Sequence, residues 1–199
     1  MKIKVILGAT RPGNVSERVA KWVTDVTKAQ GQFEVELVRL ADYDLPFLYE
    51  DGSPRYKRER KLAPNEQAWL DKLDEADGYI IVSPEYNRSM PGALKNAIDF
   101  VGHQLDRKPV ALVTHGSTGG ALAAENLRAA LRPMAVANVS EAVTLIGTGM
   151  IDERGRLSEE AAANPYGPKF QLEGLLKSLE WWTATLKAGR ESRHPAGVA

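Results

Sequence analysis

The chain has 199 residues, of which 43% are hydrophobic and 26% are charged, values typical of a water-soluble globular domain. Its 26 basic and 26 acidic side chains cancel, so charge favours neither nucleic acid nor an anionic membrane as a partner. The absence of cysteine excludes disulfides, thiolate catalysis and cysteine-bound metals. No apolar run approaches the roughly 18 residues of a membrane helix. The N-terminal sequence has no secretory cleavage pattern, so we expect a cytoplasmic protein.

Two kinds of element alternate along the chain. Short apolar or alternating runs are typical of strands, and apolar residues at intervals of three and four are typical of helices. In chain order we expect strand 2–7, helix 14–30, strand 33–40, a helix from Pro64 that carries Leu73, strand 78–83, helix 91–101, strand 109–114, a helix that carries Leu122 to Leu131, strand 138–147, and a closing helix that carries Leu172 to Leu186. The polar segments 41–63 and 148–168 are expected to be loops.

Regular alternation of strands and helices predicts a parallel sheet covered by helices on both faces. The strand at 33–40 alternates polar and apolar residues, which suits a place near a sheet edge. No repeat or linker interrupts the pattern, so we expect a single domain at 1–187 and a disordered tail at 188–199. Ligands of such sheets bind beyond the C-terminal ends of the strands. The loops expected there are 8–16, 84–92 and 115–120.

The loop GATRPGNVS at 8–16 joins a strand to a helix, a layout that favours an anion at the helix N-terminus. Asn14-Val15 stands where a triphosphate-binding loop needs Lys-Ser/Thr, and Thr10 stands where a dinucleotide-binding loop needs its middle glycine. Arg11 adds a planar cationic fork that suits phosphate. We therefore expect a monophosphate here. The alternative is a capped helix start with a solvent-exposed arginine.

In the loop PEYNRSMPG at 84–92, Pro84 and Pro91 restrict the backbone. A stiff backbone with free amides suits a flat heterocycle that needs hydrogen bonds at its edge. Tyr86 is placed to stack on or beside such a ring. Glu85 has two interpretations, a general base or, more often in a surface loop, a solvated carboxylate.

The loop HGSTGG resembles the elbow of a serine nucleophile only superficially, because His115 occupies the first glycine position of that pattern. Gly119 and Gly120 instead let the backbone approach a ligand closely. The histidines have no metal-ligand spacing, so we expect no metal site and interpret them as structural or surface residues. They are His103, His115 and His194.

Together, GATRPGNVSERVA, SPEYNRSMPGALKNAIDF and HGSTGG resemble the NADPH-dependent FMN reductase family, over roughly residues 1–185. The most specific match is the motif P-E-Y-N-x-S-x-P-G-x-L-K-N-A-I-D, which runs from Pro84 to Asp99. The resemblance implies an α/β fold, a flavodoxin-like three-layer sandwich whose five-stranded parallel sheet has the strand order 2-1-3-4-5. Arg88 departs from the family pattern, where histidine is frequent, and leaves the substrate preference open. His115-Gly116 stands where an aromatic or small residue is often seen.

The resemblance also implies an FMN-dependent NAD(P)H oxidoreductase, which passes hydride through FMN to a flavin, a quinone or a similar small acceptor. The flavin carries that chemistry, so no side chain is predicted to be catalytic. The residues implied to bind FMN are Thr10, Arg11, Asn14, Val15 and Ser16 at the phosphate, Pro84, Glu85, Tyr86 and Asn87 along the ring, and Ser117, Thr118, Gly119 and Gly120 over its other side. The nicotinamide of NAD(P)H would stack on the exposed face of the ring.

A homodimer or homotetramer is implied by the same resemblance. The helix expected at 91–101 supports it, because its apolar residues form more surface than one stripe against the sheet requires. They are Ala93, Leu94, Ala97, Ile98, Phe100 and Val101. The alternative is that these residues pack on the sheet and that the loop 41–63 covers the rest.

A non-enzymatic FMN-binding electron carrier or redox sensor is the alternative function. Carriers of this fold are typically acidic, whereas the formal net charge here is zero, so composition favours the enzyme. A phospho-receiver domain is excluded, because Leu7-Gly8 and Ser83-Pro84 occupy the positions of its acidic residues. A short-chain dehydrogenase is excluded as well, because no tyrosine is followed by lysine four residues later.

Overall fold

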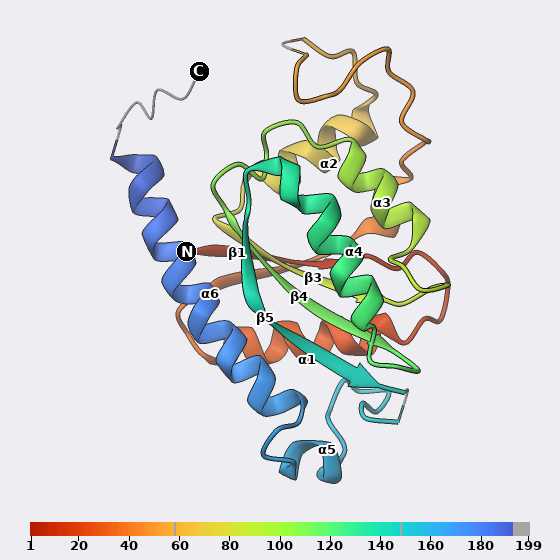
Figure 1. Cartoon of the computed structure of the whole chain (residues 1–199), viewed down its shortest axis with the longest axis vertical. Helices are drawn as coiled ribbons and strands as arrows, with labels where there is room; N and C mark the ends of the chain where they lie inside the picture. Colours follow the sequence, from red (N-terminus) through yellow and green to blue (C-terminus); the bar gives the residue numbers. More distant parts are fainter. Residues whose placement is uncertain (58, 148, 193–199) are drawn as a thin grey trace.

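A computed structural model describes residues 1–57, 59–147 and 149–192 of the chain. Its centre is a five-stranded parallel sheet of order β2-β1-β3-β4-β5 (Figure 1). The strands are β1 (Lys2–Leu7), β2 (Glu34–Arg39), β3 (Gly78–Pro84), β4 (Pro109–Gly116) and β5 (Ala137–Ile146). The predicted fold class and strand order are confirmed.

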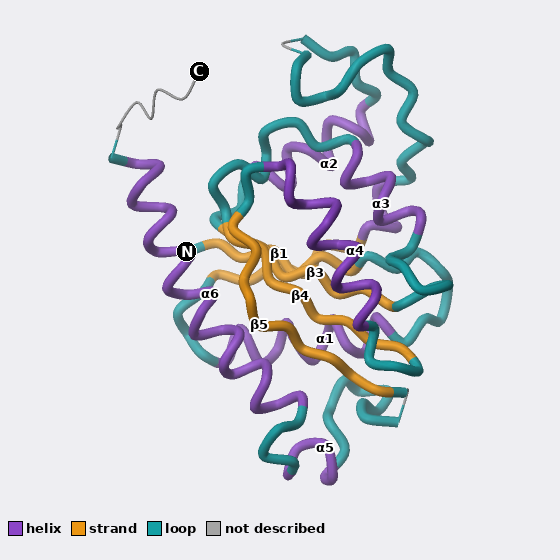
Figure 2. Tube along the Cα trace, in the orientation of Figure 1, coloured by secondary structure: helices purple, strands orange, loops and turns teal. Residues whose placement is uncertain are grey.

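Helices cover both faces of the sheet, which Figure 2 shows in orange between purple helices. One face packs against α1 (Ser16–Ala29) and α6 (Pro168–Glu191), and the other against α2 (Pro64–Asp74), α3 (Gly92–Asp99) and α4 (Ala121–Leu131). Alternate residues of β1 divide between the two cores, because side chains of a strand point to opposite faces. Val5 and Leu7 face α1 and α6, whereas Ile6 faces the other side.

Polar and apolar residues alternate along the edge strand β2, and one of the polar residues contacts a buried side chain as well as solvent. Lys4 of β1 is buried, yet its ammonium group is paired with Glu36 of β2 and with Glu75 just after α2. A buried cation is tolerated only when it is paired in this way. The position of β2 at the edge of the sheet agrees with the sequence prediction.

Apart from the exposed Ala93, the apolar residues of α3 do not form a free surface. Ala97 is 0% exposed, and its carbonyl accepts a hydrogen bond from Trp69 Nε1 of α2 at 3.0 Å. Leu94, Ile98 and Phe100 are buried in the same core, which the loop 41–63 helps to close through Leu45 and Leu48. The expectation that this helix offers apolar surface to a second chain is therefore wrong, because the chain covers that surface itself.

The C-terminal third contains more helix than the sequence indicates. A short helix α5 (Glu159–Ala163) interrupts the segment expected to be a loop, and the Ser158 hydroxyl caps it by accepting from Ala161 N at 3.2 Å. Such a short helix leaves no periodic pattern to detect. Helix α6 continues through 188–191, which the sequence pattern assigns to the tail, and Lys187 and Arg190 bind Asp77 at 2.9 and 3.4 Å. Residues 193–199 of the expected tail lie outside the described residues.

Among the helices of the described segments, none is both long and apolar enough to cross a bilayer.

Candidate cofactor-binding site

The three loops singled out in the sequence follow β1, β3 and β4, which are neighbours in the sheet. Leu7 at the end of β1 pairs with Val82 of β3, and Pro84 at the end of β3 pairs with His115 of β4. The strands therefore end nearly level, so the loops 8–16, 84–92 and 115–120 meet at one edge of the sheet.

The first loop presents unpartnered amides at the start of α1. Val15 is the N-cap residue and makes no side-chain cap, while Asn14 Oδ1 accepts from Glu17 N at 3.2 Å. Within the described segments, the backbone amides of Asn14, Val15 and Ser16 donate to no other group of the chain. Free amides at a helix N-terminus are the local structure that binds anions. Arg11 beside them is exposed and available to a ligand.

Packing against α3 explains the glycine at the end of β1. A Cβ atom on Gly8 would lie 2.6 Å from Leu94 Cδ2, a contact that only a shift of the packed leucine relieves. The absence of a side chain there lets the strand end close onto α3, so that the loop turns directly into α1. Gly8 is needed for this close approach.

The second loop is a tight hairpin. Tyr86 and Ser89 exchange both of their backbone hydrogen bonds, at 2.8 and 3.0 Å, around Asn87 and Arg88. Both central residues have positive φ, 49° and 68°, the signature of a type I′ turn. Asn126 of α4 donates to the Arg88 carbonyl at 3.1 Å and supports this strained backbone. The loop is thus rigid because of its hairpin as well as its prolines.

The Glu85 carboxylate is bound by other groups of the chain, so it is neither a freely solvated surface carboxylate nor an unpartnered base. Its carboxylate accepts from the amides of Leu122 and Ala123 at 3.0 and 3.4 Å, and Thr118 Oγ1 lies 3.4 Å away. A carboxylate at a helix N-terminus satisfies orphan amides and interacts favourably with the helix dipole. Glu85 therefore fastens the second loop to the third by capping α4.

The third loop contains two successive glycines with positive φ. A Cβ atom on Gly120, where φ is 78°, would lie 2.7 Å from Thr114 Cβ and 2.8 Å from His115 N. On Gly119 it would lie 3.3 Å from Thr144 Cβ. Both glycines thus approach the chain's own strands closely, and they turn β4 sharply into α4.

Ser16 and His115 join the first loop to the third. Ser16 Oγ lies 2.7 Å from His115 Nε2, although 99 residues separate the two in sequence. Ser16 is 0% exposed, so its hydroxyl does not lie on the open surface of the loop, where a phosphate ligand is expected. Burial, with a smaller contribution from the Arg18 charge, lowers the pKa of His115 to about 4. The imidazole is therefore neutral at pH 7.

The predicted residues lie together at this edge of the sheet, but they differ in how much of each is exposed to solvent. The exposed ones are Thr10, Arg11, Asn87, Ser117 and Thr118. The partly buried ones are Asn14, Val15, Glu85 and Tyr86, and the buried ones are Ser16, Pro84, Gly119 and Gly120. Buried members shape the site, whereas exposed members can contact a ligand. Sequence reasoning missed His115 as the link between loops, because no local pattern reveals a partner so distant in the chain.

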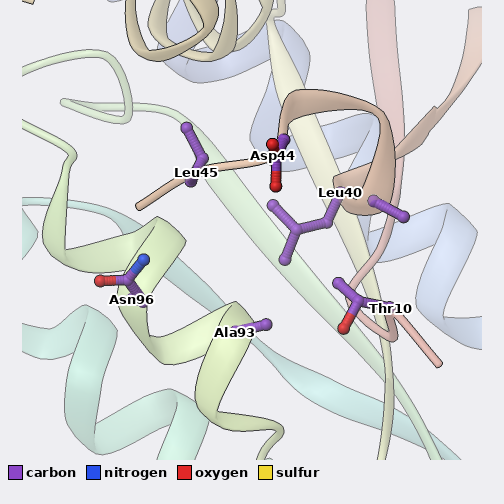
Figure 3. A pocket seen from close by; sticks show the side chains of 7 residues that line it. Thr10, Leu40, Asp44, Leu45, Ala93 and Asn96 are labelled. Carbon is purple, nitrogen blue, oxygen red and sulfur yellow. The ribbon is translucent and has the colours of Figure 1, made fainter. Parts of the chain in front are cut away.

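A cavity of about 320 Å³ adjoins the first loop and was also missed. Figure 3 shows Thr10 at one side of it and Ala93 and Asn96 of α3 at another. Leu40, Ala41, Asp44 and Leu45 complete the lining. The Asn96 amide fixes the loop above the cavity, because it donates to Pro46 O at 2.7 Å and accepts from Leu48 N at 2.9 Å. These residues come from three separate segments, so no motif indicates the cavity.

In the part of the chain that the structure describes, no three His, Asp or Glu side chains are grouped to hold a metal ion.

Known proteins are similar to this chain in sequence and in fold. Residues 1–150 match the protein family described as NADPH-dependent FMN reductase. An NAD(P)H-dependent FMN reductase of Schizosaccharomyces pombe is 34% identical over 157 residues, 76% of this chain and 78% of that protein. A quinone reductase of Escherichia coli is 33% identical over 137 residues, 64% of this chain and 68% of that protein. Among solved structures, the flavoenzyme NAD(P)H:(acceptor) oxidoreductase FerB of Paracoccus denitrificans superposes with a TM-score of 0.69 at 25% identity, covering 92% of this chain and 97% of that one.

Proposed function

This chain belongs to the NADPH-dependent FMN reductase family, and we propose on that premise that it is an FMN-dependent NAD(P)H oxidoreductase acting on a quinone, a flavin or a similar small acceptor. One observation carries the proposal. Three loops at a single sheet edge join an anion-binding helix N-terminus to a rigid hairpin, which is the arrangement that a flat ring with a phosphate tail requires.

The residues present fit FMN. The partly buried amides of Asn14 and Val15 need an acceptor that the described chain does not supply, and a phosphate oxygen is a suitable one. The exposed side chains of Thr10 and Arg11 add a hydroxyl donor and a positive charge. A monophosphate is the anion that this set can neutralise, because the loop has no lysine of the kind that a longer phosphate chain requires.

The ring would lie between the second and third loops. The hairpin from Tyr86 to Ser89 holds its backbone in one conformation, and Thr118 and Glu85 lie 3.4 Å apart where the other loop adjoins it. Rigid donors and acceptors position a bound ring at a low ordering cost. Ser117 and Asn87 are exposed on either loop and available to its polar edge.

FMN, when bound, supplies the redox chemistry by taking hydride from NAD(P)H and passing electrons to the acceptor. The chain's part is to bind, orient and shield that group. We assign no described side chain to proton transfer, because the acidic group of the second loop, Glu85, is committed to capping α4. A small acceptor suits the site, since the similar E. coli protein is a quinone reductase.

Anaerobic visible spectroscopy tests the proposal. The purified protein, titrated with FMN, should bind it saturably, and NADPH should then bleach the flavin absorbance in stoichiometric amounts. Turnover of NADPH with a small quinone and no protein partner distinguishes the enzyme from the alternative, a carrier or redox sensor. Flavin binding without turnover would favour the alternative, and failure to bind FMN or FAD would overturn the proposal.

A homo-oligomer and a cytoplasmic location complete the proposal. Large apolar side chains of α6 stand in solvent in the single chain, with Phe170 59% and Trp181 60% exposed, and a second copy of the chain would cover them. Sedimentation at micromolar concentration tests this assembly, and a monomer with full activity would contradict it. The reductant supports a cytoplasmic location, because NAD(P)H is an intracellular metabolite.

A further inference from the structure

His115 lies at the junction of the three loops. Its backbone carbonyl accepts a hydrogen bond from Glu85 N of the second loop at 2.9 Å, and its Nε2 lies 2.7 Å from Ser16 Oγ of the first loop. The sheet fixes its own backbone, because it pairs with Pro84 of β3 and Leu145 of β5. One residue at the start of the third loop therefore touches both of the others.

The contact with Ser16 is buried. Ser16 is 0% exposed and His115 is 7% exposed, so water does not replace a lost bond between them at low cost. The imidazole is neutral at pH 7, and a neutral ring either accepts from the Ser16 hydroxyl or donates to it, depending on its tautomer. Either arrangement holds the same two atoms together.

Ser16 is the first residue of α1 and directly follows Asn14 and Val15, whose amides we assign to the phosphate. The direction of those amides depends on where the first turn of α1 stands relative to β4. The Ser16–His115 bond fixes this relation. Donors that are held in place before binding lose less conformational freedom when an anion arrives.

We propose that His115 is a positioning residue, which holds the phosphate-binding turn of α1 in place through Ser16. The inference rests on the proposed function, because it identifies the anion as the phosphate of FMN. It gives the Ser16 hydroxyl a supporting role instead of a direct contact with the ligand. The consequence is specific: the pair favours FMN over riboflavin, which lacks the phosphate.

Flavin titration of variants tests this role. Ser16→Ala and His115→Phe each remove the bond, and each should weaken FMN binding by about three- to tenfold while riboflavin binding changes less than about twofold. The double variant should bind FMN as tightly as the single variant with the lower affinity, because both changes remove the same bond. His115→Gln, which keeps a polar group near the Nε2 position, should restore most of the affinity. The matched controls are Ser140→Ala and His103→Phe, both on the exposed surface.

Amide hydrogen exchange on the flavin-free protein supplies a readout that needs no cofactor. Exchange at Glu17, Arg18 and Val19 should be faster in Ser16→Ala and in His115→Phe than in the wild type or the controls. If the wild type binds no flavin, the proposed function fails, and exchange alone decides: unchanged rates in the first turn of α1 overturn the inference. If the wild type binds FMN and the variants bind it equally well, or lose FMN and riboflavin in equal proportion, His115 does not position the phosphate site and the proposed function stands.

Discussion

The guanidinium carbon of Arg11 lies 5.0 Å from the centroid of the Tyr86 ring, so the first loop (8–16) and the second loop (84–92) touch through a cation–π contact. A cation is attracted to an aromatic face within about 6 Å, although the energy is small where both groups meet solvent. A phosphate would form stronger, charge-assisted hydrogen bonds with the same guanidinium. We therefore expect Arg11 to turn from the ring to the phosphate when FMN binds, which frees the face of Tyr86 for the flavin.

Replacing Arg11 with alanine should weaken FMN binding by about ten- to a hundredfold, because a hydrogen bond to a charged group contributes about 1.5–3 kcal/mol. Riboflavin binding should change little, since it has no phosphate. Fluorescence titration with both ligands measures the two affinities. Arg132→Ala removes an exposed arginine outside the three loops and serves as the control. Equal losses for FMN and riboflavin would show that Arg11 acts through Tyr86 or the fold.

Replacing Glu85 with alanine should lower stability by about 1 kcal/mol, because α4 loses the acceptor for two of its first amides. For a chain of this size that corresponds to a fall in Tm of about 2–4 °C. Glu85→Gln retains an acceptor oxygen and should lose less. Thermal unfolding measures the effect. A Glu85→Gln variant that is stable but as inactive as Glu85→Ala, in turnover of NADPH with a quinone, would instead establish Glu85 as a proton-transfer group.

Gly120→Ala should destabilise the chain by about 1–3 kcal/mol. The φ of 78° at Gly120 disfavours a side chain, and the added Cβ atom would lie 2.7 Å from Thr114 Cβ. Gly174→Ala is the matched control. Gly174 lies in α6, where an added Cβ atom would meet no neighbour within 4 Å, so alanine there should stabilise the helix by about 0.5–1 kcal/mol. Urea unfolding of the two variants should give changes of opposite sign. Equal changes would contradict the strain assigned to Gly120.

The fold was predictable because its signal is local and repeated. Each buried strand is a short apolar run, and the alternation with helical patterns leaves few ways to arrange a parallel sheet. The edge position of β2 followed from alternation within a single strand. By contrast, α5 is too short to show a period, and the apolar excess of α3 was misleading because α2 and the loop 41–63 cover it from distant parts of the sequence.

The meeting of the three loops at one sheet edge was predictable, but the contacts among them were not. Parallel strand ends and motif spacing located the three loops. The partners of Ser16, Glu85 and Arg11 lie on other loops, and only the folded chain brings them together. Ser16 illustrates the difference, because its place in the motif suggests a ligand whereas its burial gives it a structural partner. The cavity beside Thr10 is assembled from three segments and has no motif at all.

The histidine that links the loops should also give the protein a measurable sensitivity to acid. The pKa of His115 is lowered from 6.5 to about 4, chiefly by burial, with the Arg18 charge adding to it. The unfolded chain therefore binds a proton between these two values that the folded chain does not bind. The stability that the neutral histidine contributes is full above about pH 6.5 and falls as the pH is lowered toward 4.

Urea unfolding of the flavin-free protein between pH 7.5 and 4.5 tests this sign. As the pH falls, the wild type should lose more free energy of unfolding than His115→Gln does. The difference between the two losses should reach up to about 3 kcal/mol for the full pKa shift of His115. Carboxylates with lowered pKa values, such as Asp77 and Glu36, titrate in both proteins, so the difference between the two slopes isolates the histidine. The comparison uses slopes and not absolute stabilities, because the substitution itself changes packing. Parallel slopes would mean that His115 titrates in the folded chain as it does in the unfolded one, and that the imidazole beside Ser16 is not held in its neutral form.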